Sequence, residues 1–237
     1  MYVTKTTFVY EQLRDALLTG KYPPNQKLVL KELSQELDVS PMPVREAMNH
    51  LENDGLVTKV PHQGYTVSPL SLGEMQELFE LRMVLEAFAL KSSVARIEEQ
   101  SLQKLFDLTG EMEQYIEEHE KKTNPPSSHP EPEQKKFMAI NREFHLTIVS
   151  AAGYTHLPAI LHNIFDKSER YMNLLEFVVG LDRSDLLDHQ HIVQAIQSQD
   201  TEKAEHLITK HIQRVLAELK QYVIKHDWIP EREYRRE

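Results

Sequence analysis

Apolar residues in the first 70 positions are spaced as in two short helices followed by two strands. In residues 28–37 they recur three and four positions apart, which predicts a helix with one apolar face. A second helix is predicted to start at Pro41, with Ser40 as its cap, and to end at Gly55, because proline suits a first turn and glycine follows a last one. Two β-rich runs lie between residues 56 and 67, separated by turn residues. Helix, turn, helix and hairpin in this order predict a winged helix-turn-helix.

From residue 71 onward the apolar positions keep helical spacing over long segments. The proline-rich segment 121–134 has almost no apolar residue and is predicted to be an exposed loop, while 231–237 is a charged tail. The predicted fold class is therefore mainly α. It combines a winged helix-turn-helix with a small β-hairpin wing in residues 1–70 and an all-α helical bundle in residues 71–230. The helices predicted for the bundle are 71–98, 102–118, 135–152, 157–179, 184–198 and 201–226.

Composition sets limits on the function. The chain has 237 residues, which is room for two modest cores, and no cysteine, which excludes disulfides and thiolate metal sites. No apolar run approaches the length of a membrane span and the first residues lack a signal-peptide pattern, so we expect a cytoplasmic protein without membrane contact. The net charge is −10, but residues 1–70 hold 7 Lys and Arg against 8 Asp and Glu. Attraction for DNA phosphates must therefore come from local placement of basic side chains.

The motifs resemble a known family over nearly the whole chain. The first 70 residues are similar to the DNA-binding domain of GntR-type bacterial transcriptional regulators through YEQLRDALLTGKYPPNQKL, ELSQELDVS, PVREAMNHLENDGLV and HQGYTV. Later motifs resemble the FadR-like branch, whose effector domain is an all-helical bundle called FCD: ELRMVLEAFAL, NREFHLTIVSAAG and DHQHIVQAIQSQDTEKAEHLITKHI. The resemblance implies a ligand-responsive regulator. We expect it to bind a palindromic double-stranded DNA operator as a homodimer, because one winged helix covers too few bases to be selective.

The resemblance also implies which residues contact DNA. This chain departs from its relatives at Pro41 and Met42, where they commonly have Arg and Thr. Proline cannot donate a hydrogen bond to a base, so base reading should shift to Lys31, Arg45 and the wing, and the operator cannot be inherited from relatives. The positions that match DNA-facing positions of the family are Lys31, Ser40, Met42 and Arg45, and the wing tip His62, Gln63 and Gly64.

Three predicted helices each carry one histidine on their apolar face: His145, His189 and His211. Asn141 lies four residues before His145, on or beside the same stripe, so the two side chains should converge. Three imidazoles and an oxygen suit a divalent transition metal, most simply Zn²⁺, with Ni²⁺ as the other candidate. The resemblance points to the same four residues, because a metal-binding subset of FCD domains uses an Asp or Asn four before a His and two later His. His191 and His206 are out of phase with the apolar faces and are expected to be solvated.

Alternatives remain open at this point. Each histidine taken singly also fits an ordinary core position, so a metal-free pocket in the same fold is the second interpretation. A metal-dependent hydrolase is the third, although no HExxH motif, nucleophile elbow or phosphate loop is present. A bound cation favours a small carboxylic acid as effector. Arg82, or more weakly Arg170, could clamp its carboxylate, although Arg82 could equally pair with Glu86 one turn later.

Overall fold

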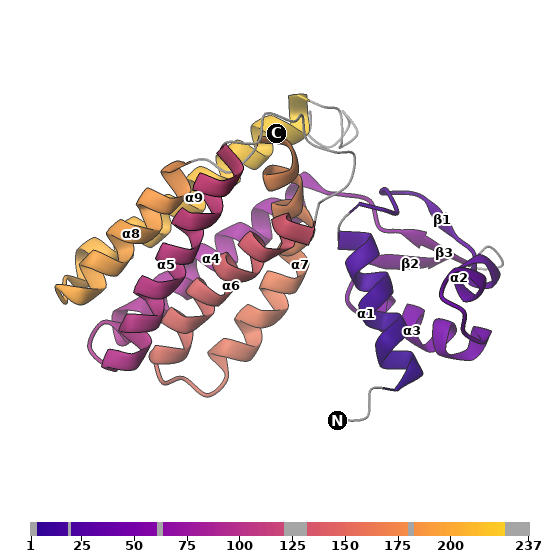
Figure 1. The fold of residues 1–237 in the computed structure, drawn as a ribbon, viewed down its shortest axis with the longest axis horizontal. Coiled ribbons are helices and arrows are strands. Elements are labelled where there is room, and N and C mark those ends of the chain that lie inside the picture. Colours follow the sequence, from indigo (N-terminus) through magenta and orange to yellow (C-terminus); the bar gives the residue numbers. More distant parts are fainter. Residues whose placement is uncertain (1–3, 19, 61–63, 121–131, 180–182, 226–237) are drawn as a thin grey trace. The chain divides into compact units, whose positions relative to one another are not determined.

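The computed structural model describes residues 4–18, 20–60, 64–120, 132–179 and 183–225 (Figure 1). The chain forms two compact units, Met1–Ser71 and Leu72–Glu237. The fold class predicted from the sequence is confirmed, because the first unit combines helices with a small sheet and the described part of the second is helical. Within the described ranges, the side chains at 119–120, 132–135, 170, 173–179 and 225 are not included.

The first unit is built around one buried helix. Val44, Ala47, Met48 and Leu51 of this helix, α3, are fully buried, and α3 packs against α1 and α2. The spacing of these four residues is what makes α3 helical, because it keeps all of them on one face. The elements of the unit are α1 (Lys5–Leu18), β1 (Lys27–Leu28), α2 (Leu30–Glu36), α3 (Pro41–Asn53), β2 (Val57–Val60) and β3 (Gly64–Val67).

Both ends of α3 lie where the sequence signals place them, but one expected hydrogen bond is absent. After α3, Gly55 has φ +78, its N–H donates to the carbonyl of Glu52, and the next N–H donates to the carbonyl of Leu51. This is the hydrogen-bond pattern of a helix closed by a left-handed glycine. At the other end Ser40 occupies the cap position with extended backbone, but its side chain makes no capping hydrogen bond. The predicted cap hydrogen bond is therefore absent.

A third strand was not predicted. Leu28 was assigned to the first helix, but it lies in β1, which pairs with β3 (Leu28 with Tyr65), and helix α2 begins only at Leu30. The sheet order is β1-β3-β2, with antiparallel pairing throughout. Gly64 has φ +97, and a Cβ there would lie 3.3 Å from the carbonyl oxygen of Leu28. Glycine is therefore required where the wing meets β1.

The second unit packs its helices around α4 (Figure 1). Helix α4 contacts α6, α7 and α9, while α5 contacts α6 and α8, and α8 contacts α9. Among the described residues, no helix is long and apolar enough to cross a bilayer. The elements of the unit are α4 (Leu72–Ser93), α5 (Glu99–Glu120), α6 (Pro132–Ala151), α7 (Leu157–Val179), α8 (Arg183–Gln197) and α9 (Thr201–Lys225).

Several predicted helix boundaries in this unit were wrong, and α5 begins at Glu99 where the sequence predicted residue 102. The helix predicted to run to residue 98 ends at Ser93, whose carbonyl accepts the N–H groups of Arg96 and Ile97 in a turn. Helix α6 begins at Pro132, inside the segment predicted to be a loop, because proline is well suited to the first helical position. Residues 121–131 and the tail 231–237 lie outside the described residues.

Candidate metal centre and nucleic-acid interface

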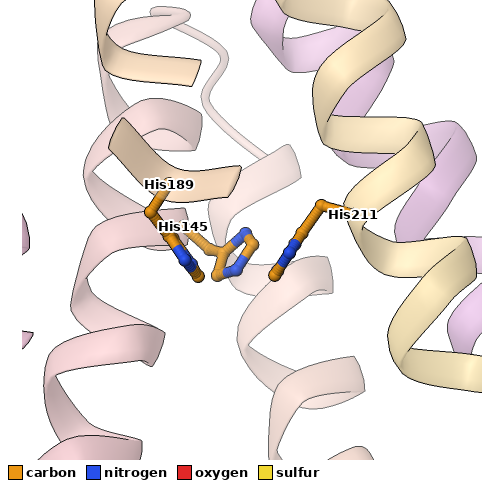
Figure 2. A group of neighbouring side chains, drawn as sticks. All are labelled: His145, His189 and His211. Carbon is orange, nitrogen blue, oxygen red and sulfur yellow. The ribbon is translucent and has the colours of Figure 1, made fainter. Parts of the chain in front are cut away.

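The second unit brings together three buried histidines from three helices: His145 of α6, His189 of α8 and His211 of α9. Each offers one ring nitrogen, and these nitrogens lie within 4.8 Å of one another. The ring centroids are 4.5 to 5.5 Å apart. Figure 2 shows the three imidazoles turned toward a common region between the helices. Imidazole nitrogens are among the ligands that divalent transition metals such as Zn²⁺ prefer in proteins.

In each of the three rings the Nδ1 atom already has an oxygen partner. His145 Nδ1 lies 2.5 Å from Glu86 Oε2, and His189 Nδ1 lies 2.6 Å from the backbone carbonyl oxygen of Asp185. His211 Nδ1 lies 3.3 Å from Asp188 Oδ2. Donation from Nδ1 to an oxygen fixes the proton on that nitrogen and leaves Nε2 with a lone pair. Metal-binding histidines in proteins are oriented in this way.

Two of the three Nε2 atoms of the cluster have no hydrogen-bond partner among the described residues. Among the described residues, His145 Nε2 and His189 Nε2 are buried side-chain atoms that make no hydrogen bond. Such atoms cost free energy unless something else satisfies them. Burial lowers the pKa of His145 and lowers that of His189 well below its usual value, with the neighbouring imidazoles adding to the effect at His189. Both rings are therefore neutral at neutral pH, the form that binds a metal.

Helix α4 contributes a buried ion pair beside the cluster. Arg82 Nε donates to Glu86 Oε1 at 2.9 Å, and the other carboxylate oxygen of Glu86 contacts His145. The Arg82 guanidinium also lies over the ring of Phe165, 4.3 Å from its centroid. Burial raises the pKa of Glu86, but its contacts with His145 and Arg82 outweigh burial and hold the pKa below its usual value. The pairing of Arg82 with Glu86, the simpler of the two interpretations from the sequence, is therefore present.

One arginine links the partners of two histidines. Arg214 of α9 contacts the carboxylate of Asp185, and its Nη2 donates to Asp188 Oδ2 at 2.9 Å. Asp185 supplies the carbonyl that accepts from His189, and Asp188 supplies the carboxylate that accepts from His211. A single guanidinium thus holds the carboxylate that accepts from His211, and it also contacts the side chain of the residue whose backbone carbonyl accepts from His189.

Asn141 borders the cluster from the side of a small cavity. It is buried on α6 and lines the cavity together with Arg82, Asp185 and His211. The cavity has a volume of about 20 Å³, enough for one water molecule or ion. Arg82 therefore faces this space as well as pairing with Glu86. The side chain of Arg170, the weaker candidate for effector binding, lies outside the described residues.

The remaining histidines of the two helices do not join the cluster. His191 of α8 and His206 of α9 are exposed. Sequence reasoning missed Arg214, and it considered Glu86 only as a partner of Arg82. The available signal was that Arg82 and Glu86 occupy the same face of α4 as its apolar core residues, where a charged side chain needs a partner.

In the first unit, the side chains predicted to face DNA lie on the surface. Lys31 of α2, Ser40, and Met42 and Arg45 of α3 are exposed, and Gly64 at the start of β3 is partly exposed. His62 and Gln63, the rest of the predicted wing tip, lie outside the described residues.

Comparison with known proteins identifies both units. Residues 5–67 match the family described as bacterial regulatory proteins, gntR family, and residues 77–214 match the FCD domain. The chain is 25% identical over 213 residues to the HTH-type transcriptional regulator YdhC of Bacillus subtilis (strain 168), covering 89% of each chain. It is 24% identical over 218 residues to the HTH-type transcriptional repressor GlaR of Escherichia coli (strain K12), covering 86% of this chain and 90% of that one.

A solved structure shows the same fold. Escherichia coli McbR/YncC matches with a TM-score of 0.73 and 22% identity, over 93% of this chain and 99% of that one. The relatives are named transcriptional regulators, which bind DNA and are not enzymes, so the hydrolase considered from the sequence is set aside. The family resemblance of the sequence is confirmed. Because the two domain matches account for both compact units, the chain belongs to the GntR family of bacterial transcriptional regulators and carries a C-terminal FCD domain.

Proposed function

We propose that this regulator holds a divalent metal ion in its FCD domain and uses it to bind a small carboxylic acid that controls DNA binding. The observation that carries the proposal is the state of the three histidines. Each Nδ1 has an oxygen partner, while two buried Nε2 atoms have none in the described structure. An apolar core would not leave such atoms unsatisfied, and a cation among them satisfies both.

The ligand set would be His145, His189 and His211, with Asn141 as the oxygen donor. Imidazoles with an amide oxygen favour Zn²⁺, and Ni²⁺ is the other candidate. Asn141 is neutral, so the ion would keep its full +2 charge, whereas an aspartate would cancel one unit. The ion would then bind more weakly to the protein and attract an anion more strongly.

The effector would reach the ion through the cavity that Arg82 and Asn141 line. A carboxylate could bind the ion directly, with Arg82 as a second anchor, because a guanidinium pairs well with a carboxylate. The cavity volume of about 20 Å³ is too small for an organic acid. Binding must therefore displace lining side chains such as Met172, whose flexible thioether adapts readily. A ligand regulates only if it prefers one arrangement of the protein, and such coupling is typically about 1–3 kcal/mol.

For DNA binding, we propose that α3 and the wing contact the operator and that two copies of the chain act together. Arg45, Met42 and Lys31 are exposed, as DNA contacts require. Support for a second copy comes from α4, whose side opposite to its core exposes Leu81, Val84 and Phe88, spaced on one helical face. An exposed apolar row of this kind is typical of an interface.

Metal content tests the centre directly. Protein purified without added metal and dialysed against metal-free buffer should retain about one ion per chain by elemental analysis. His189→Ala should lose most of it, because one of three imidazoles is removed. The matched control is His191→Ala, two residues away on the same helix but exposed. A parent protein that retains no metal would contradict the proposed centre. A His189→Ala protein that retains as much metal as the parent would show that the ion is bound elsewhere.

A second experiment tests sensing. Operator binding is titrated with a panel of metabolic carboxylic acids, using metal-loaded protein and protein treated with a chelator. An effector acid should change the DNA dissociation constant by roughly 5–150-fold in loaded protein only. An equal change in both preparations would contradict the role of the ion in binding the acid.

A further inference from the structure

The outward face of α3 carries four side chains at helical spacing: Met42, Arg45, Glu46 and Asn49. Met42 is 73% exposed, more than any other exposed large apolar side chain of the described chain. Pro41 before it is also exposed, so the amino end of α3 presents an apolar tip. A single exposed apolar side chain is ordinary on a protein surface, and what distinguishes Met42 is its place at the amino end of the helix that is proposed to contact DNA.

Two of the four side chains accept hydrogen bonds from other residues of the first unit. Asn49 Oδ1 accepts a hydrogen bond of 2.7 Å from the hydroxyl of Tyr65 on β3. Glu46 Oε2 accepts one of 2.7 Å from the hydroxyl of Thr6 on α1. Asparagine reads adenine through its carbonyl and its amide together, and the hydrogen bond from Tyr65 ties the carbonyl of Asn49 to β3. Base reading by this face therefore falls to Arg45 and Met42.

We propose that Met42 determines operator specificity by packing against the C5-methyl group of a thymine in each half-site. The inference rests on the proposed contact of α3 with DNA. In the major groove the thymine methyl is the apolar group that distinguishes one base pair from the others, and it is read by apolar side chains. Arginine recognises the O6 and N7 acceptors of guanine. Arg45 and Met42 lie three residues apart, so the face would read a guanine and a nearby thymine in one half-site.

The size of the effect follows from the area of one methyl group. Burial of such a group contributes about 0.8 kcal/mol, which corresponds to about a fourfold change in the dissociation constant. A symmetric dimer makes the contact twice, so loss of both methyl groups should weaken binding by about fifteenfold.

The test uses the full chain and an operator selected from random duplex DNA by binding to it. Each thymine is then replaced in turn by deoxyuridine, which removes the methyl group and keeps the base pair. We expect one symmetry-related pair of thymines whose replacement raises the dissociation constant by about fifteenfold. Met42→Gln keeps the length of the side chain and removes its apolar character, and it should bind the thymine and deoxyuridine operators equally.

The matched control is Arg45→Ala, which should weaken binding to both operators and keep the ratio between them. The inference is overturned if no thymine is sensitive to the exchange, or if Met42→Gln keeps the full ratio. An Arg45→Ala protein that binds like the parent would instead overturn the contact of α3 with DNA. Circular dichroism and thermal unfolding verify that the exposed substitution leaves the fold unchanged.

Discussion

Glu86 is a carboxylate with 2% of its side chain exposed, and it touches a guanidinium and an imidazole at once. Glu86→Gln removes its charge and leaves the buried cation of Arg82 uncompensated. We expect the free energy of unfolding to fall by about 3–5 kcal/mol in metal-free protein, measured by urea denaturation. In the double variant with Arg82→Met, much of the lost free energy of unfolding should be recovered, because no buried charge remains and methionine fills the space beside Phe165. Glu80→Gln, in an exposed pair with Gln76 on the same helix, should change little.

Arg214 is expected to matter for the metal although it is not a proposed ligand. Arg214→Met removes the guanidinium that holds the carboxylate of Asp188, so the ring of His211 loses its oriented partner. We expect metal affinity to fall about 10–100-fold, measured by competition with a chromogenic chelator. Arg142 provides the comparison, because its side chain is 25% exposed against 26% for Arg214 and pairs with other acids. An equal loss in Arg142→Met would assign the effect to general destabilisation.

At the scale of elements, two glycines of similar exposure should respond in opposite ways to alanine. Gly55 closes α3 at φ +78, so Gly55→Ala forces a side chain into the left-handed region and should cost about 1–2 kcal/mol. Gly110 lies inside α5 with open space around it, so Gly110→Ala should stabilise by about 0.5–1 kcal/mol. Thermal unfolding of both variants measures the contrast. Stabilisation by Gly55→Ala would mean that residue 55 does not have a positive φ in the folded protein.

The elements also show where sequence reasoning reaches its limit. Helix α3 could be predicted because its apolar spacing, its prolines and Gly55 all agree. Strand β1 could not, because two residues carry no period and the strand exists only through its pairing with β3. The burial of His189 could be predicted, because the apolar spacing of its own helix places it on the buried face. The contacts of Arg214 could not, because they depend on how α8 packs against α9.

At the scale of the whole molecule, the apolar row on α4 decides the oligomeric state that we propose. Val84 is 67% exposed, so Val84→Lys should leave each chain folded but place a charge in the interface of the dimer. We expect sedimentation to show monomers and the operator dissociation constant to rise by tenfold or more, since both half-sites are no longer held together. Leu187→Lys, at an exposed apolar position of α8, is the control. A Val84→Lys protein that remains dimeric would exclude this face.

The three histidines come from three different helices, of which α6 is separated from α8 and α9 by the whole of α7, and this has a consequence for how long the protein survives. An ion that joins α6, α8 and α9 binds the folded chain and not the unfolded one. At about 1,000 times its dissociation constant such an ion adds about 4 kcal/mol to folding. A change of that size alters the fraction of chains open to proteases about a thousandfold. On this proposal, a bacterium short of the metal would lose copies of the regulator by degradation, and its target genes would respond to metal supply through the number of regulator molecules.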